Sequence, residues 1–218
     1  MSRRHPQRAS LVDRFFGTRL MCLMLLLVSS GCASGLFPKP QAQATLLALE
    51  DQGLSAGSTA RAALPLTLVV EVPRAAAGYD TRNMAYLRRA HEIEYFAVHQ
   101  WVDTPAQMLA PLMTQALRRS GVVRAAVLAP TAAVGELRLE SELVRLQQDF
   151  RHTPSQVRLT VRVLLVHAPT RRALAWRELD VSTVSASEDP YGGAVAASAA
   201  VTRLLQQLVI FVDEAAPR

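Results

Sequence analysis

The sequence predicts a single α+β domain: a mostly antiparallel sheet with two amphipathic helices packed on one of its faces. Three consecutive long segments, 136–150, 157–165 and 173–185, alternate apolar and polar residues, which is typical of an antiparallel meander with one solvent-exposed face. Two other segments repeat apolar residues every three or four positions, as amphipathic helices do, and they lie on either side of the meander. Shorter strand patterns precede the first helix.

The N-terminal part of the predicted domain contains these short strands. The first candidate runs from Thr45 to Leu49. The segment 66–72 consists mainly of apolar β-forming residues and ends at Pro73, so we expect a strand buried on both faces. The polar stretch 88–92 is flanked by apolar residues that alternate with polar ones, which predicts a hairpin: Met84, Tyr86, Ile93 and Tyr95.

Both predicted helices have recognisable boundaries or faces. The first begins at Thr104 and Pro105, because threonine is a helix cap and proline suits the first helical position, and it ends at Gly121. Arginines in its last turn complement the helix dipole, namely Arg118 and Arg119. A short strand is expected over 122–128. The second helix, from about 191 to 213, closes the chain with a broad apolar face.

The first 31 residues have the parts of a secretory signal. Five arginines and one acid precede the nine-residue apolar run Leu20–Val28, and small residues lead to Gly31 and Cys32. The run is well short of the roughly 20 residues that a membrane-spanning helix needs. A cysteine directly after Gly31 predicts a lipoprotein, cleaved between Gly31 and Cys32 and carrying acyl chains such as palmitate on Cys32. Ser29 stands where such signals usually have leucine, and an ordinary signal peptide with a free Cys32 thiol is the alternative.

We therefore expect three regions: a signal peptide at 1–31, a lipidated tether at 32–43 and one folded domain at 44–218. The tether has two prolines and no periodicity, and eleven flexible residues span roughly 20 Å. Removing residues 1–31 takes away five arginines and Asp13, so the net charge of +6 falls to +2, from 19 basic and 17 acidic residues. Without a clustered basic stripe, nucleic-acid binding is not expected.

The sequence lacks the patterns of a catalytic, metal or cofactor site. Cys22 lies in the signal, so Cys32 is the one cysteine of the mature chain, and neither a disulfide nor a cysteine-based metal site is expected. The histidines show no spacing that would place two imidazoles on one helix face. A phosphate-binding loop, a G-x-S-x-G elbow and a G-x-G-x-x-G motif are also missing from the sequence. We expect a non-enzyme without cofactors, which depends on a partner ATPase for any energy.

The stretch from Val72 to Val127 carries a specific resemblance. It reads V-P-x(4)-G-Y-D-T-x(2)-M-x-Y, then I-E-Y-F-A-x(2)-Q-W, then P-x-Q-M-L and a helix ending before G-V-V. This pattern resembles the ABC-type transport auxiliary lipoprotein family, the lipoprotein partners of mammalian-cell-entry type lipid transporters. The residues that carry the match are Pro73, Gly78, Asp80, Met84, Tyr86, Tyr95, Trp101, Pro105, Leu109 and Leu112.

The resemblance implies a non-catalytic, periplasm-facing lipoprotein of an intermembrane phospholipid transport system. Its partners would be a substrate-binding subunit of the mammalian-cell-entry class, a permease and an ATPase, and homo-oligomerisation stays open. Ala33, in place of an aspartate after the cysteine, fits anchoring in the outer membrane. Two other functions remain alternatives: a lipid-binding carrier lipoprotein, and a lipoprotein that assists the assembly of outer-membrane barrels.

The roles of the motif residues are also open at this point. Asp80 follows Gly78 just before a strand, so it either forms a turn through hydrogen bonds to nearby backbone N–H groups or contacts a partner. Aromatic residues at alternating strand positions belong either to the core or to a lipid-binding surface: Tyr86, Tyr95 and Trp101. Arg158 and Arg162 lie on the predicted polar face of the meander, either solvated or in contact with an acidic partner.

Overall fold

Five strands precede the first described helix, and the long meander follows it. The structure, a computed structural model, describes residues 43–53 and 63–217. The predicted signal, Cys32 and nearly all of the tether lie outside the described residues. Within 44–218 the elements, in chain order, are β1 (Thr45–Leu47), β2 (Leu64–Val70), β3 (Arg74–Ala75), β4 (Asn83–Arg89), β5 (Glu92–Trp101), α2 (Pro105–Ser120), β6 (Val123–Leu128), β7 (Leu137–Asp149), β8 (Gln156–His167), β9 (Arg172–Val184) and α3 (Pro190–Ala215).

The nine described strands form one mixed sheet, and its long ladders are antiparallel. β7 pairs with β8 and β8 with β9 over nearly their whole lengths, so the predicted meander is confirmed. The other edge of β7 pairs with three short strands in succession: β2, β3 and β4, all parallel to it. β6 then lies parallel to β2, β5 antiparallel to β4, and β1 parallel to β5. The parallel pairings were not predicted, because a short apolar run does not reveal which distant strand it joins.

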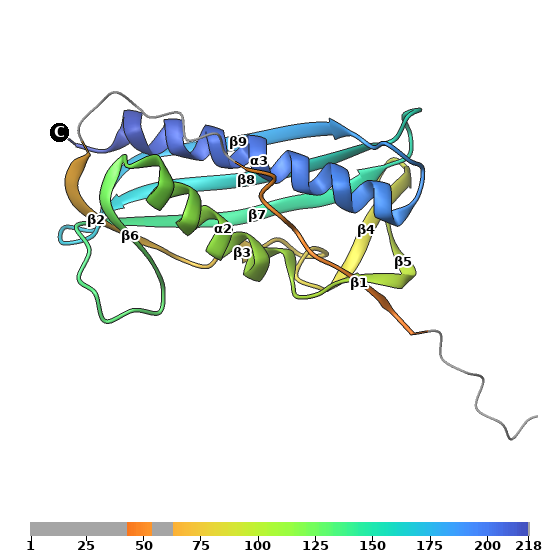
Figure 1. Cartoon of the computed structure of the whole chain (residues 1–218), viewed down its shortest axis with the longest axis horizontal. Helices are drawn as coiled ribbons and strands as arrows, with labels where there is room; N and C mark the ends of the chain where they lie inside the picture. Colours follow the sequence, from red (N-terminus) through yellow and green to blue (C-terminus); the bar gives the residue numbers. More distant parts are fainter. Residues whose placement is uncertain (1–42, 54–62, 218) are drawn as a thin grey trace, which may run out of the picture. The chain divides into compact units, whose positions relative to one another are not determined.

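Both helices pack against the same sheet, as predicted (Figure 1). α2 contacts β6 and β2, α3 contacts β8 and β9, and the two helices contact each other. The core contains the apolar side of the meander together with the inner faces of the helices, for example Leu139, Leu159, Leu109 and Leu204. α3 is long and apolar enough to cross a membrane by length and composition, but here it packs on the sheet as a core helix does.

The helix ends show how the local sequence sets their limits. Gly121, with φ +68°, ends α2 in the left-handed conformation, as the sequence predicted. Thr104 stands at the N-cap of α2 but makes no side-chain capping bond. At α3, Asp189 accepts the N–H of Gly192 at 2.7 Å. This backbone hydrogen bond lowers the pKa of Asp189 below its ordinary value.

The β4–β5 hairpin is present, but its two strands differ in burial. β4 lies between β5 and β7, and it buries four consecutive residues, Met84 to Leu87. β5 lies nearer the sheet edge, and a register shift interrupts its pairing with β4. Ile93 and Tyr95 are therefore exposed, by 41% and 39%, although their alternation resembled that of core residues. The burial of β4 and the exposure of β5 differ because β4 lies inside the sheet and β5 lies nearer its edge. Alternation in the sequence does not indicate whether a strand is central or near an edge.

Candidate functional site

The face of the sheet opposite the helices carries a groove. Three hollows of about 580, 390 and 220 Å³ follow one another across β2, β7, β8 and β9. The first and second share Arg138 and Ala168, and the second and third share Glu140 and Leu164. Arg138 and Glu140 alternate with buried Leu137 and Leu139, which places them on the side away from the helices. We call this continuous surface the outer groove.

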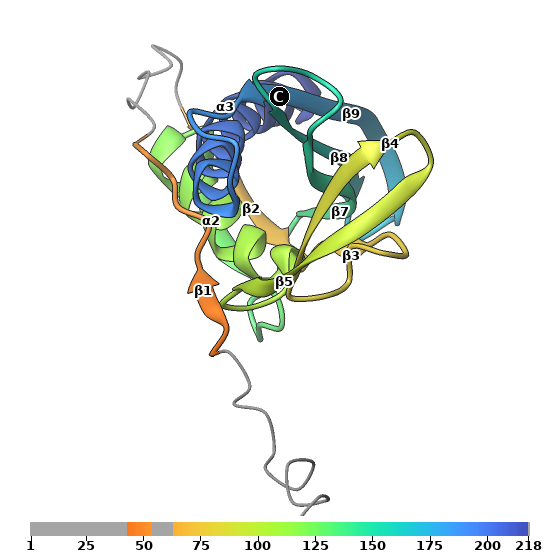
Figure 2. The same cartoon turned by 90° about the vertical axis from the view of Figure 1, so that its right-hand side faces the viewer.

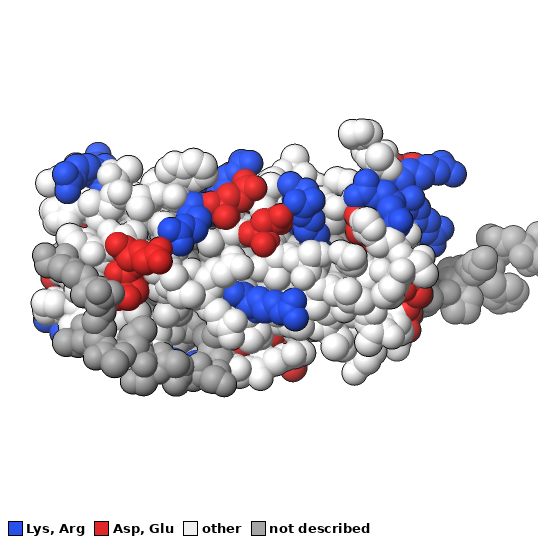
Figure 3. Space-filling view, turned by 90° about the horizontal axis from the view of Figure 1, so that it is seen from above, with Lys and Arg blue, Asp and Glu red and all other residues white. Residues whose placement is uncertain are grey.

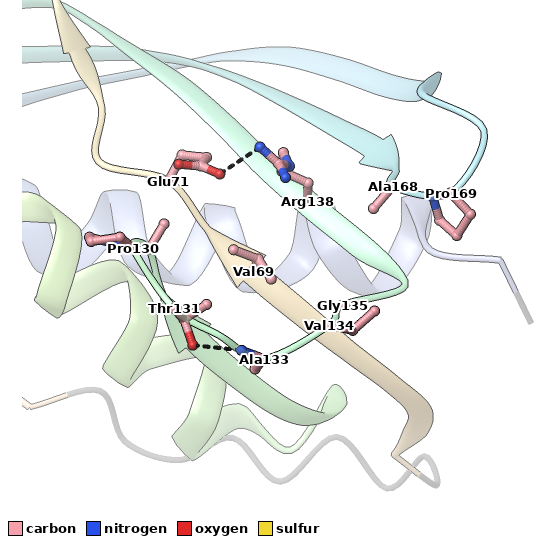
Figure 4. A pocket seen from close by; sticks show the side chains of 11 residues that line it. Val69, Glu71, Pro130, Thr131, Ala133, Val134, Gly135, Arg138, Ala168 and Pro169 are labelled. Carbon is pink, nitrogen blue, oxygen red and sulfur yellow. Dashed lines mark hydrogen bonds and ion pairs between the residues drawn. The ribbon is translucent and has the colours of Figure 1, made fainter.

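The loop between β6 and β7 forms one wall of the outer groove (Figure 4). Gly135 lies so close to β2 that a Cβ there would be 2.7 Å from Cγ2 of Val69, so glycine allows the loop to lie against the strand. The carboxylate of Glu136 accepts the backbone N–H of Thr67 at 2.6 Å, and this bond lowers the pKa of Glu136. Farther along the loop, Val134 is 91% exposed. The loop is thus held at its base while presenting an apolar side chain to solvent.

The first hollow contains one acidic and one basic side chain, so its net charge is zero. Arg138 and Glu71 form an ion pair with a nitrogen–oxygen distance of 2.9 Å, and both side chains are partly exposed (Figure 4). Small apolar residues surround the pair, including Ala129, Pro130, Ala168 and Pro169. A partner with both apolar and hydrogen-bonding groups would match this lining better than a purely charged or purely aliphatic one.

Trp176 dominates the far end of the outer groove. It lies on β9 opposite Leu164 of β8, and it is 72% exposed. Beside it Arg162 forms ion pairs with Glu178 at 2.9 Å and Glu142 at 3.4 Å. An exposed tryptophan beside internally paired charges is a common anchor of protein interfaces, because its large apolar surface is released from water on binding.

Ion pairs also run along the rest of this face. Arg158 donates two hydrogen bonds to Asp180, at 3.1 and 2.7 Å, and they lower the pKa of Asp180. In the view from above, several basic and acidic side chains lie next to one another in the upper part of the picture, with large uncharged areas around them (Figure 3). Arg158 and Arg162 thus form ion pairs within the domain, and contact with an acidic partner stays a proposal for these two residues.

Between the sheet and α3, the described residues line a small hollow. The hollow there has a volume of about 10 Å³ and is lined by residues of β4, β5, β7, β8 and α3, among them Phe96, Trp101 and Gly193. This volume is at the lower limit for a single water molecule, so it does not hold an acyl chain. Within the described residues there is also no group of three potential metal-binding side chains. The open outer groove is consequently the candidate functional site.

The motif residues lie on other parts of the domain. Six of them are buried: Pro73, Met84, Tyr86, Trp101, Pro105 and Leu109. The hydroxyl of Tyr86 donates to Glu94 at 2.8 Å, which raises the pKa of Tyr86, and its ring packs 4.5 Å from that of Phe96. A shared lipid-binding surface of Tyr86, Tyr95 and Trp101 is therefore not formed, because two of the three rings are inside the core.

Gly78 and Asp80 lie in the turn that leads from β3 to β4. Gly78 has φ +89°, a conformation that favours glycine. The hydrogen bonds expected from Asp80 to backbone N–H groups are not found among the described residues, and its side chain is exposed. Contact with a partner thus remains a proposal for Asp80.

Sequence reasoning did not single out the outer groove. Trp176 lies within the third alternating segment, 173–185, whose pattern alone gives it no role. Its position offered a signal, since it shares a strand face with Glu178 and Asp180, two and four residues later. The contribution of the β6–β7 loop had no such signal, because it depends on the loop lying against β2.

Comparisons with known proteins agree with the fold. Among solved structures, protein XCC0632 from Xanthomonas campestris matches with a TM-score of 0.72 and 21% identity, over 79% of this chain and 96% of its own. An uncharacterized protein matches with a TM-score of 0.61 and 10% identity, over 78% of this chain and 99% of its own. At these identities the likeness shows the fold alone. No curated protein matches the sequence.

A family model decides the classification. The model described as ABC-type transport auxiliary lipoprotein component matches residues 47–209, which is most of the domain and includes the motif described above. This chain therefore belongs to the ABC-type transport auxiliary lipoprotein component family.

Proposed function

We propose that this lipoprotein serves an ABC-type transporter of the mammalian-cell-entry class, which moves phospholipid between membranes. In this proposal, acylated Cys32 anchors the protein in the outer membrane and the domain faces the periplasm. Family membership supports the auxiliary role in transport. The signal pattern, with Gly31 and Cys32 followed by Ala33, supports the anchor.

The outer groove is the proposed docking site for the transporter's substrate-binding subunit. The observation that carries this assignment is the 72% exposure of Trp176 beside Arg162, whose ion pairs with Glu142 and Glu178 form within the domain. Since Arg162 already has acidic partners, binding there would depend mainly on burying Trp176 and its apolar neighbours. A side chain of this size is the usual centre of an interface hot spot.

An adaptor fits the structure better than a lipid carrier. A carrier needs an apolar cavity that encloses much of its ligand, and such cavities generally measure about 300 Å³ or more. The hollow between sheet and helices has about 10 Å³, and the larger hollows are open on the sheet face. Lipid would accordingly pass through the partner subunits while this protein holds them in place.

Mild cross-linking in cells, followed by purification of the lipoprotein from membranes, tests the proposal. We expect to recover a mammalian-cell-entry subunit together with acyl chains on Cys32, and to lose the subunit, but not the acylation, in Trp176→Ala. Ile210→Ala is the matched control, because Ile210 is an exposed apolar residue on α3, outside the groove. A stoichiometric lipid retained in native mass spectrometry would favour a carrier. Recovery of a barrel protein without an ATPase would favour an assembly role.

A further inference from the structure

Exposed apolar side chains gather at one end of the domain. Eleven large hydrophobic residues are exposed in the described part of the chain, and eight of them lie near this end. One is on β1, four are on β5 or directly after it, one is the last residue of β9, and two are in the first two turns of α3. They form what we call the apolar end: Leu46, Ile93, Tyr95, Val98, Val102, Val184, Tyr191 and Val195. A concentration of this kind usually marks a surface that another apolar body covers.

These elements come together in space although they are far apart in sequence. Figure 2 looks at the domain from the side where β1, the β4–β5 hairpin and the start of α3 meet. β1 pairs with β5, with Thr45 opposite His99. β5 and α3 jointly line the small interior hollow through Phe96, Trp101 and Gly193.

The chain reaches the domain at this same end. β1 begins at Thr45, and the twelve residues 33–44 separate it from Cys32. A linker of twelve residues spans roughly 20 Å on average, compared with a radius of gyration of roughly 16 Å for a domain of this size. If Cys32 is acylated, the start of β1 stays within about that distance of the bilayer. The part of the domain nearest the lipid is then the apolar end.

The border of the apolar end also suits a lipid surface. The tip of the β4–β5 hairpin carries Arg88 and Arg89, both exposed. The guanidinium of Arg88 lies 5.2 Å from the centre of the Tyr86 ring. The side chain of Tyr191, an apolar ring with a terminal hydroxyl, is 67% exposed. Tyrosine and arginine are typical of membrane-interface positions, because their apolar parts bury among acyl chains while their polar ends stay hydrated.

We propose that the apolar end rests on the phospholipid bilayer that holds the acylated cysteine. This inference depends on the proposed acylation of Cys32 and adds to it a second membrane contact, made by the folded domain. The contact fixes the orientation of the domain: the meander strands lead away from the bilayer, and the outer groove stays open to the periplasm. An acyl attachment at Cys32 without this second contact would leave that orientation free.

Fluorescent labels in liposomes test this contact directly. The acylated protein is prepared with a single cysteine at Val98 or Tyr191, labelled with an environment-sensitive dye, and reconstituted into phosphatidylcholine–phosphatidylglycerol liposomes. Because Cys32 is acylated, the introduced cysteine is the free thiol of the mature chain. We expect both labels to shift to shorter wavelength and to be quenched by brominated phospholipid. Control labels at Val134 and Trp176, both in the outer groove, should show neither effect.

Three outcomes would overturn the inference. Equal quenching at all four positions in protein whose Cys32 carries acyl chains would refute the membrane contact while leaving the proposed anchor intact. Cross-linking of two copies through the Val98 cysteine, without quenching by the brominated lipid, would show that a second copy covers the apolar end. Mass spectrometry showing no acyl group on Cys32 would overturn both the anchor and this inference.

A charge-introducing variant gives an independent measurement. In Val98→Asp/Tyr191→Asp the label is placed at Leu46, and its quenching by brominated phospholipid should fall to the level of the groove labels. The matched control, Ile210→Asp, places the same charge on an exposed apolar position of α3 outside the apolar end and should leave quenching unchanged. Circular dichroism confirms that each variant is folded. Unchanged quenching in the folded double variant would contradict the proposal.

Discussion

The hydroxyl of Tyr95 donates a hydrogen bond to the backbone carbonyl of Gly78 at 2.9 Å. Gly78 belongs to the turn between β3 and β4, and Tyr95 lies on the exposed side of β5. The bond joins two parts of the family motif that are 17 residues apart. These residues therefore have a shared structural role: they hold the turn against the β4–β5 hairpin.

Gly78→Ala should destabilise the domain by about 1–2 kcal/mol, because φ +89° is strained for a residue with a Cβ. Space is not the reason, since a Cβ at this position would meet the Tyr95 hydroxyl at an ordinary 3.5 Å. Urea denaturation measures the change. Ala77→Ser, an exposed replacement in the same turn, is the control and should change the unfolding free energy by less than about 0.5 kcal/mol.

Tyr95→Phe removes the hydrogen bond to Gly78 while keeping the ring. We expect a loss of about 0.5–1.5 kcal/mol in the free energy of unfolding, the usual net value of one such bond. Tyr191→Phe is the matched control, since Tyr191 is exposed on α3 and its hydroxyl makes no hydrogen bond within the described residues. Equal effects of the two replacements would mean that the Tyr95–Gly78 bond contributes nothing.

Gly193→Ala should also be destabilising, here for lack of space. Gly193 lies in the first turns of α3, and a Cβ there would overlap the side-chain amide of buried Gln148. Overpacking of this kind costs about 1–3 kcal/mol. In a Gln148→Ala background the same change should cost clearly less, because the obstructing group is gone. A double-mutant cycle measures this coupling, and additive effects would show that the overlap is relieved elsewhere.

Stability should fall in acid as Asp149 becomes protonated. Arg151 donates side-chain hydrogen bonds to Asp149 at 2.8 and 2.5 Å, which lower the pKa of Asp149 in the folded state. A lowered folded pKa means that the unfolded chain binds the proton more readily. The stabilisation is therefore complete above the unfolded pKa near 3.9 and disappears as pH falls through the folded value.

This behaviour is measurable by comparing Tm with that of Asp149→Asn. The variant should melt lower at neutral pH, and the difference from the unmodified protein should shrink below about pH 4. Asp80→Asn is the control, because the exposed Asp80 carboxylate has no hydrogen bond within the described residues. A Tm difference for Asp149→Asn that is as large at pH 2 as at pH 7 would rule out loss of the Asp149 charge as its origin.

Trp176→Ala should weaken binding of the transporter's substrate-binding subunit by at least about 2 kcal/mol, or roughly thirtyfold in Kd, if Trp176 is the centre of the interface. The unfolding free energy should change little, because the side chain is 72% exposed. Titration of the purified subunits measures the affinity. An unchanged Kd would exclude Trp176 as the anchor of the outer groove.

Much of the secondary structure could be predicted because its signals are local. The meander of β7, β8 and β9 follows from alternation of apolar and polar residues over long segments, and α2 follows from its apolar spacing between Pro105 and Gly121. The motif from Pro73 to Trp101 was sufficient to indicate the family that the model over 47–209 then showed. The burial of individual motif residues was less predictable: Tyr86 is in the core and Tyr95 is exposed, although both lie in the predicted hairpin.

The amino-acid sequence alone determined the α+β class, the meander, both helices and the family, because periodicity, capping residues and motifs are properties of neighbouring residues. The tertiary structure decided that β2, β3 and β4 follow one another along β7, that the β6–β7 loop forms a wall of the outer groove, and that apolar residues of β1, β5 and α3 meet at one end. These features depend on which distant segments pack together. Pairing and packing between segments are settled by the free energy of the whole domain, which no local pattern records.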